Sequence, residues 1–213
     1  MTARSVGADE ECHCRFESLQ PAAVTERADD RAERLTQEVR RAVLPITTDA
    51  ELAALRRYQA LDRTYELVNQ FLRGERQAED LSAVEAAEVR SIVMGLSELL
   101  KRWRTPEPLV VYRGLRSRTG LPLDPNLEAA SFLSTTIARD VALAEFTVPS
   151  GPGGPVLLEI SVPAGTPGVW APALGDPALA YQGELLLGRG VQLAVRDRRD
   201  EAGILVLDCE VEP

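Results

Sequence analysis

The chain contains few of the residues that build metal sites and disulfide frameworks. Of its 213 residues, only one is histidine and three are cysteine. His13 stands between Cys12 and Cys14, and the distant Cys209 does not complete a familiar set of metal ligands. Three cysteines cannot all pair within one chain, so a disulfide scaffold is not indicated. We expect no metal site, and we interpret residues 1–20, which are polar and lack periodicity, as a disordered tail.

Long apolar runs are missing as well. No segment is apolar for long enough to span a bilayer, and the N-terminal residues lack the apolar core of a signal peptide. Basic residues are in deficit, since 24 Lys and Arg face 33 Asp and Glu, which gives a net charge of −9. We therefore expect no membrane span, any export to use a route other than a classical signal peptide, and no long non-specific contact with nucleic acid. A local basic patch could still bind nucleic acid.

The sequence otherwise has the composition of a globular domain, with 45% hydrophobic and 27% charged residues. Residues 21–213 are enough for one domain with a sizeable core. Residues 22–43 are rich in charge and carry only a thin apolar stripe, which consists of Val24, Leu35, Val39 and Val43. This pattern predicts a peripheral helix, which either packs on the domain or binds an immunity or delivery partner.

Two capping boxes mark the next helices. Thr48 and Glu51 form a T-x-x-E box ahead of a helix predicted over residues 50–74, which Gly74 would cap. Ser82 and Glu85 form a second box ahead of another helix. Each helix has one apolar face: Leu61, Tyr65, Val68 and Leu72 on the first, and Val89, Ile92, Val93, Leu96, Leu99 and Trp103 on the second.

After Pro108 the hydrophobic period changes from that of helices to that of strands. Clusters of Pro and Gly separate six short segments rich in β-branched residues or leucine, namely LVVYRGL, SFLSTT, PVLLEISV, GELLLG, VQLAV and GILVLDCEV. A helical layer over residues 22–104 followed by a β core over residues 109–211 predicts the α+β class. We expect an antiparallel-rich core of two sheets with the helices packed on it.

Polar residues along these strands mark a candidate site. They are Arg113 in VVYRGL, the hydroxyl cluster that begins at Ser134, and the pair Gln182 and Glu184 in YQGELLLG. Taken singly, each has a plain structural explanation, such as a surface ion pair or the exposed face of a half-buried strand. Residues i and i+2 of an extended segment share a face, so Gln182 and Glu184 are expected to point into one cleft, where Gly183 permits close approach.

Together these features suit chemistry on a dinucleotide. An arginine grips phosphate oxygens in two parallel bonds, and a serine hydroxyl can fix the orientation of a carboxylate. A glutamate beside a ribose can accept a hydrogen bond from the 2′-hydroxyl. The same carboxylate can stabilise the positive charge that grows as a glycosidic bond breaks.

The ordered set resembles the mono-ADP-ribosyltransferase toxins of the arginine–serine–glutamate class. The resemblance rests on YRG, FLSTT and Q-x-E-L-L-L-x-R-G, with YELVNQFLR and PEPLVVYRG upstream, and it covers residues 50–211. It implies an ADP-ribosyltransferase-like fold and an enzyme that uses NAD as a substrate without a metal. It also implies a toxin or effector that is secreted or delivered into a target cell and acts in the cytoplasm.

The resemblance implies a role for each matched residue. Arg113 is expected to hold the phosphate on the nicotinamide side of NAD, and the Gly114 backbone to meet the nicotinamide amide. Ser134 is expected to orient Glu184, which would bind the ribose 2′-hydroxyl and stabilise the oxocarbenium ion. The other expected NAD contacts are Asn69 and Arg73 on the adenosine and phosphate side, and Phe146, in the loop after the hydroxyl strand, over nicotinamide.

Gln182 bears on the acceptor of ADP-ribose. Relatives that modify arginine usually carry E-x-E, whereas Q-x-E resembles the clostridial Rho-modifying exoenzymes, which modify asparagine, and the guanine-modifying DNA group. A carboxamide can hydrogen-bond an amide, a hydroxyl or a base edge. The resemblance therefore favours a non-arginine acceptor, namely Asn, Gln, Ser or Thr of a target protein, and Tyr181 either touches that target or simply packs.

Three rival functions stay open. An NAD glycohydrolase would use the same site with water as the acceptor, and a transferase could act on a nucleic-acid base. A non-catalytic module that binds NAD or a protein is the third, although such a module has no need of the Glu184 carboxylate. Uptake of label by added protein or nucleic acid distinguishes them.

Overall fold

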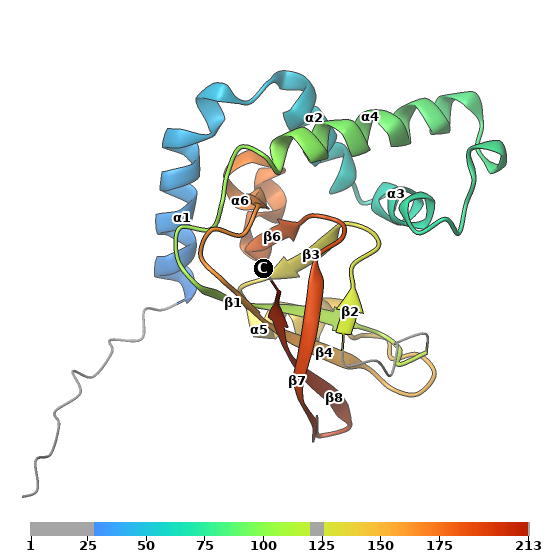
Figure 1. The fold of residues 1–213 in the computed structure, drawn as a ribbon, viewed down its shortest axis with the longest axis vertical. Coiled ribbons are helices and arrows are strands. Elements are labelled where there is room, and N and C mark those ends of the chain that lie inside the picture. Colours follow the sequence, from blue (N-terminus) through green and yellow to red (C-terminus); the bar gives the residue numbers. More distant parts are fainter. Residues whose placement is uncertain (1–27, 120–125, 213) are drawn as a thin grey trace, which may run out of the picture.

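The computed structural model describes residues 28–119 and 126–212. The tail predicted over residues 1–20, the Cys12–Cys14 segment and the first residues of the predicted peripheral helix lie outside these ranges. Four helices come first, and Figure 1 shows them gathered at one end of the molecule: α1 (Ala28–Ala42), α2 (Asp49–Tyr58), α3 (Thr64–Leu72) and α4 (Ala83–Leu99). Short 3-10 turns occupy Leu44–Ile46 and Ala78–Asp80.

The strands occupy the second half of the chain. They are β1 (Leu109–Leu115), β2 (Asn126–Glu128), β3 (Leu133–Thr136), β4 (Val156–Val162), β5 (Gly168–Trp170), β6 (Glu184–Leu187), β7 (Gln192–Glu201) and β8 (Ile204–Val211). Helix α5 (Arg139–Phe146) follows β3, while α6 (Ala171–Leu174) and the 3-10 helix η3 (Pro177–Gln182) stand between β5 and β6. All six predicted strands are confirmed, and the sequence patterns missed β2, β5, α5, α6 and η3.

The strands form one eight-stranded sheet in the order β2-β7-β8-β4-β1-β3-β6-β5. Every neighbouring pair is antiparallel except β4 and β8, which are parallel. The α+β class is therefore confirmed, but the expected division into two sheets is corrected to one continuous sheet. The sheet consists of a part from β2 to β1 and a part from β3 to β5. Pairing of β1 with β3 at a single position, Tyr112 with Thr136, joins these two parts.

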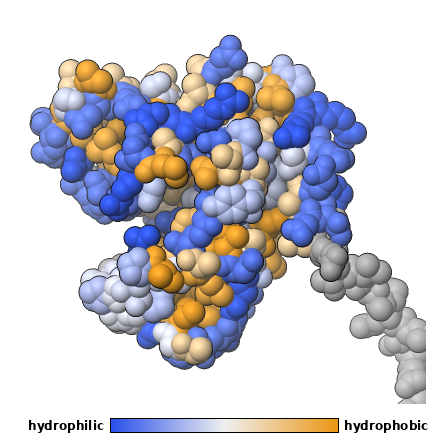
Figure 2. Space-filling model, turned by 180° about the vertical axis from the view of Figure 1, so that it is seen from behind, coloured by the Kyte–Doolittle hydropathy of each residue, from blue (hydrophilic) through white to orange (hydrophobic). Residues whose placement is uncertain are grey.

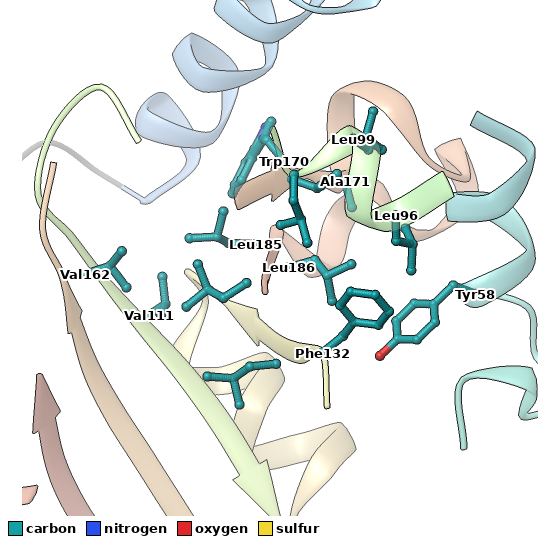
Figure 3. Close-up of a cluster of buried hydrophobic side chains, with 14 of the residues drawn as sticks. Tyr58, Leu96, Leu99, Val111, Phe132, Val162, Trp170, Ala171, Leu185 and Leu186 are labelled. Atoms are coloured by element: carbon teal, nitrogen blue, oxygen red, sulfur yellow. The ribbon is translucent and has the colours of Figure 1, made fainter. Parts of the chain in front are cut away.

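The main core lies between the helical layer and the sheet. Leu96 and Leu99 of α4 lie above Leu185 and Leu186 of β6, beside the ring of Phe132 (Figure 3). Helix α1 closes one side of this core, and Leu35 and Val39 on its apolar stripe are buried, as is Val43 directly after the helix. The Trp170 indole Nε1 also donates to Thr36 Oγ1 at 2.8 Å, so α1 is fastened to β5.

A smaller apolar cluster covers the opposite face of the sheet. Ala142 of α5 packs there on Leu157 of β4 and Val206 of β8. Because both faces of β4 are covered, Leu157 is buried as fully as Ile160. Among the described residues, no helix is long and apolar enough to cross a membrane.

Both predicted capping boxes are confirmed. The Thr48 side chain accepts from the Glu51 backbone N–H while the Glu51 carboxylate accepts from Thr48 N, and Ser82 and Glu85 repeat this exchange. Each box satisfies backbone donors that the first helical turn leaves unpaired. Gly74, with a φ of +72°, caps α3 as expected.

The prediction of one helix over residues 50–74 is wrong in one respect, because a non-helical segment separates α2 from α3. Asp62 accepts hydrogen bonds from the backbone and the hydroxyl of Thr64, and it also pairs with Arg57. Arg63 takes a φ of +67°, which no helix interior allows. Leu61, expected on the apolar face, is 89% exposed at this break.

Candidate active site

The site lies where the helical layer meets the sheet. Seen from behind, the molecular surface is indented between the helix-rich end and the strand-rich end (Figure 2). The residues predicted to bind NAD come from both parts: Asn69 lies on α3 and Arg73 at its C-cap, while Arg113, Ser134 and Glu184 lie on β1, β3 and β6.

Ser134 and Glu184 are brought together by the pairing of β3 with β6. Ser134 pairs with Leu186 and Thr136 with Glu184, so the serine lies diagonally across from the glutamate on the same face of the sheet. The Ser134 hydroxyl donates to Glu184 Oε1 at 2.5 Å. The two residues are therefore in contact, and the role of Ser134 in orienting Glu184 during catalysis stays a prediction.

Arg113 belongs to the same hydrogen-bonded unit. Its guanidinium Nη1 donates to the backbone carbonyl of Ser134 at 2.7 Å. A chain of hydrogen bonds thus links Arg113 to Ser134 and Ser134 to Glu184, although the three residues come from three strands.

Burial governs the ionisation of Glu184, which is 8% exposed. Removal from water raises the pKa of the Glu184 carboxyl, because the charged form loses its hydration. Hydrogen bonds from Ser134 and Gln59 and the positive charge of Arg113 oppose this rise. The site therefore contains a carboxylate that is poorly solvated yet held in place by donors.

Positive charge also gathers here. Burial lowers the pKa of the Arg113 guanidinium, and the nearby positive charge of Arg73 lowers it further, while the charge of Glu184 acts in the opposite direction. Arginine stays protonated under such conditions, so the two guanidinium groups repel each other. An anionic ligand would relieve that repulsion, and a pyrophosphate has the matching charge and oxygen geometry.

Arg73 and Asn69 differ in how freely they face solvent. Arg73 is exposed and grips Glu75 in two bonds, of 2.6 and 3.0 Å, which raises the pKa of Arg73. Asn69 is buried, and its amide Nδ2 donates to the Tyr58 hydroxyl at 3.0 Å. As the structure stands, Asn69 therefore supports Tyr58.

Tyr58 is a buried core residue that lies near Arg113 and Glu184. Its ring packs edge-on against Phe132, with centroids 5.8 Å apart (Figure 3), and its buried hydroxyl bonds with the Asn69 amide. Burial raises the pKa of the Tyr58 hydroxyl to about 12, so the phenol is neutral and can act as a hydrogen-bond donor.

Gly114 and Phe146 are neighbours, but not in the way the sequence indicated. Phe146 does not lie in a loop; it is the last residue of α5 and is 38% exposed. A Cβ at Gly114 would lie 2.8 Å from Phe146 Cβ and would overlap the Ala142 carbonyl. Glycine at this position therefore lets α5 pack directly on β1 and sets the place of Phe146.

The segment that carries Gln182 is a turn, and the expected extended geometry is wrong. Gln182 ends the 3-10 helix η3, and Gly183 follows with a φ of +55° before Glu184 begins β6. The reason is local, because Asp176 caps η3 by accepting from the Ala178 N–H. Thr136 holds the end of the turn, with its hydroxyl donating to the Gln182 carbonyl.

The turn places Gln182 against α5. Its amide Nε2 donates to the Glu145 carboxylate at 2.9 Å, and Tyr181 beside it is 61% exposed. A carboxylate only accepts, so the side-chain oxygen Oε1 of Gln182 must face the other way. Among the described residues, that oxygen accepts no hydrogen bond.

Gln59 was missed by the sequence patterns. It follows α2 directly, and its side-chain Nε2 donates to Glu184 Oε2 at 2.7 Å. Nothing in the local sequence marks it, because the two residues are 125 positions apart.

A separate cavity of about 290 Å³ lies between α1 and the turn, and neither Arg113, Ser134 nor Glu184 lines it. Among the described residues, no cluster of His, Cys, Asp or Glu could hold a metal ion.

The model of the ADP-ribosyltransferase exoenzyme family matches residues 25–208. The chain belongs to this family. It is therefore an NAD-dependent mono-ADP-ribosyltransferase of a toxin-like kind, as the resemblance indicated. Comparison with curated protein sequences gives no match.

Solved structures share the fold of this transferase. The C3 exoenzyme of Clostridium limosum is 17% identical, with a TM-score of 0.66 over 86% of this chain and 94% of that one. The Vis toxin, an ADP-ribosyltransferase from Vibrio splendidus, is 16% identical, with a TM-score of 0.65 over 88% of each chain. The S. aureus C3stau2 structure with NAD is 19% identical, with a TM-score of 0.62 over 85% of this chain and 94% of that one. At identities this low, the structural similarity establishes the shared fold and nothing about the acceptor.

Proposed function

We propose that this transferase moves ADP-ribose from NAD to a side-chain amide or hydroxyl of a target protein, using Arg113, Ser134 and Glu184 for the chemistry. The observation that carries the proposal is the linked unit in which Arg113 bonds the Ser134 backbone and the Ser134 hydroxyl bonds Glu184. A protein that only bound NAD would have no use for a buried carboxylate held at both oxygens.

In this proposal Arg113 neutralises the phosphate on the nicotinamide side, and Arg73 and Asn69 serve the adenosine and phosphate side. The Gly114 backbone and the Phe146 ring contact the nicotinamide. As the bond between ribose C1′ and the nicotinamide nitrogen breaks, its electron pair leaves with neutral nicotinamide. Glu184 stabilises the positive charge left on the ribose, and the acceptor atom forms the new bond to C1′ and loses its proton.

The acceptor class is proposed from Gln182. Because its Nε2 is engaged by Glu145, it presents a carbonyl oxygen, which suits an acceptor that donates an N–H or O–H. Side-chain amides and hydroxyls meet this requirement, and unlike a guanidinium they do not call for a carboxylate that can bind them in two parallel bonds. The exposed ring of Tyr181 lies beside Gln182 and would contact the surface of the target.

Membership of this family supports a proposal about the place of action. We propose that the transferase is secreted or delivered into a target cell and acts in the cytoplasm, where both NAD and protein acceptors are present.

The test is transfer of labelled ADP-ribose from NAD into host and bacterial lysates, with Glu184→Gln as the control. Protein and nucleic-acid fractions are read separately. A discrete labelled protein that is absent with Glu184→Gln supports the proposal, and its modified residue should be Asn, Gln, Ser or Thr. An arginine acceptor, label in nucleic acid, or nicotinamide release with no labelled macromolecule would each overturn the acceptor assignment.

A further inference from the structure

Gln59 contacts the Glu184 carboxylate although the two residues are 125 positions apart in the sequence. Its Nε2 donates to Glu184 Oε2 at 2.7 Å, and its Oε1 accepts from the backbone N–H of Asp176 at 2.9 Å. Both ends of the amide are therefore used. The orientation is fixed by chemistry, since only Nε2 can donate to a carboxylate and only Oε1 can accept from an N–H.

The neighbouring residues leave room for this arrangement. A Cβ at position 175 would overlap Gln59 Oε1, so Gly175 permits the bond to Asp176. Asp176 is also the N-cap of η3, the segment that carries Tyr181 and Gln182. Gln59 thus connects the start of the acceptor-side turn with the carboxylate at its end.

We infer that Gln59 is a positioning residue for Glu184. Ser134 holds Oε1 and Gln59 holds Oε2, so the carboxylate cannot rotate without losing a donor. This inference rests on the proposed role of Glu184. A carboxylate oxygen has a second lone pair, so Oε2 can still accept from the ribose 2′-hydroxyl while Gln59 remains in place.

The arrangement also affects ionisation. The groups that face Glu184 are Arg113 from β1, Tyr58 and Gln59 from α2 and its end, and Ser134 from β3. Donors to the charged form lower the pKa of Glu184 against the effect of burial. Loss of Gln59 would leave Ser134 and Arg113 alone to do this, and the pKa of Glu184 would rise.

The first variant is Gln59→Met, which keeps the length of the side chain and removes both polar ends. We expect kcat for nicotinamide release to fall about 10- to 100-fold, the factor for one hydrogen bond to a charged group. KM for NAD should change by less than about threefold, because the lost interaction acts in the transition state. The acid limb of the pH profile should move to higher pH.

The matched control is Gln37→Met, at an exposed position on α1. Its kcat, KM and pH profile should equal those of the wild-type protein.

The second variant, Gln59→Glu, keeps an acceptor for Asp176 and removes the donor to Glu184. It places two carboxylates side by side, so activity should be lost at neutral pH. Activity should recover in part in acid, where one shared proton restores a donor to Glu184. A purely structural role for Gln59 would not produce this inverted pH dependence.

An NMR titration of the Glu184 carboxyl, assigned with Glu184→Gln, gives a readout that needs no turnover. We expect the carboxyl to titrate at higher pH in Gln59→Met than in the wild-type protein. Equal kcat, pH profiles and titrations in the two proteins would overturn the inference. If the wild-type protein itself releases no nicotinamide, the proposed function fails, and the titration still decides whether Gln59 acts on Glu184.

Discussion

Among single residues, Glu184 is buried, yet the proposed mechanism needs its side chain to be negatively charged. Replacing it by glutamine keeps the shape of the side chain and removes the charge that would stabilise the ribosyl cation. We expect Glu184→Gln to lower nicotinamide release by roughly 10²- to 10³-fold, as the loss of one preorganised electrostatic group does. The fold should persist, so circular dichroism should match that of the wild-type protein. Unchanged release would remove Glu184 from the mechanism.

The raised pKa of Glu184 has a consequence for activity. The carboxylate must be ionised to act, so activity should fall as the pH drops through the raised pKa, with a midpoint above the usual carboxyl value of 4.5. The measurement is a pH profile of single-turnover nicotinamide release. A midpoint at or below 4.5 would mean that the donors outweigh burial.

The same shift should appear in stability, with its sign fixed by linkage. A group whose pKa is higher in the folded state than in the unfolded state stabilises the fold below its unfolded pKa, and this contribution is lost as pH rises through the folded pKa. Glu184→Gln removes that dependence. We therefore expect the melting temperature of Glu184→Gln, relative to the wild-type protein, to increase from acid to neutral pH. A difference that stays constant with pH would contradict the shift.

Among elements, the turn before β6 decides where Gln182 and Glu184 point. Gly183 has a φ of +55°, and a Cβ there would lie 3.0 Å from Ile137 Cγ1. We expect Gly183→Ala to cost about 1 kcal/mol of stability from the left-handed backbone. ADP-ribose transfer should fall roughly tenfold or more, because small misplacements of reacting groups are costly.

Gly190 provides the control for this variant. It has a φ of +81°, and nothing lies within 4 Å of the Cβ that alanine would add. Gly190→Ala should lose a similar free energy of unfolding in urea while keeping transfer activity. Equal activity losses in both variants would mean that backbone strain alone, and not the direction of Gln182 and Glu184, explains the effect.

For the molecule as a whole, α1 is part of the folding unit. Leu35 is fully buried in the main core, so Leu35→Ala should lower the free energy of unfolding by about 2–5 kcal/mol. Met94→Ala, at a position 69% exposed on α4, should change it by less than about 0.5 kcal/mol. Urea unfolding measures both. A small effect at Leu35 would favour the alternative in which this helix serves mainly to bind a partner.

The sequence patterns located most elements because their signals are local. The capping boxes at Thr48 and Ser82 join residues three positions apart, and alternating apolar residues show along a single strand. The break after Tyr58 escaped this reasoning, because the apolar spacing of a helix continues through residues 59–63, where the hydrogen bonds of Asp62 and the positive φ of Arg63 hold the chain out of the helix. Helix α5 escaped as well, since its fit on β1 depends on Gly114, far from it along the chain.

The amino-acid sequence was enough to establish the fold class, the acidic balance, the order of the arginine, serine and glutamate motifs and, through these motifs, the family. Those features are fixed by residue type and short spacing. Three features became visible only in the folded molecule: the strands form one sheet, Gln182 turns toward Glu145, and Gln59 joins Ser134 at Glu184. The reason is physical: a hydrogen bond between side chains 125 positions apart exists only once β6 is in the sheet and α2 is packed beside it.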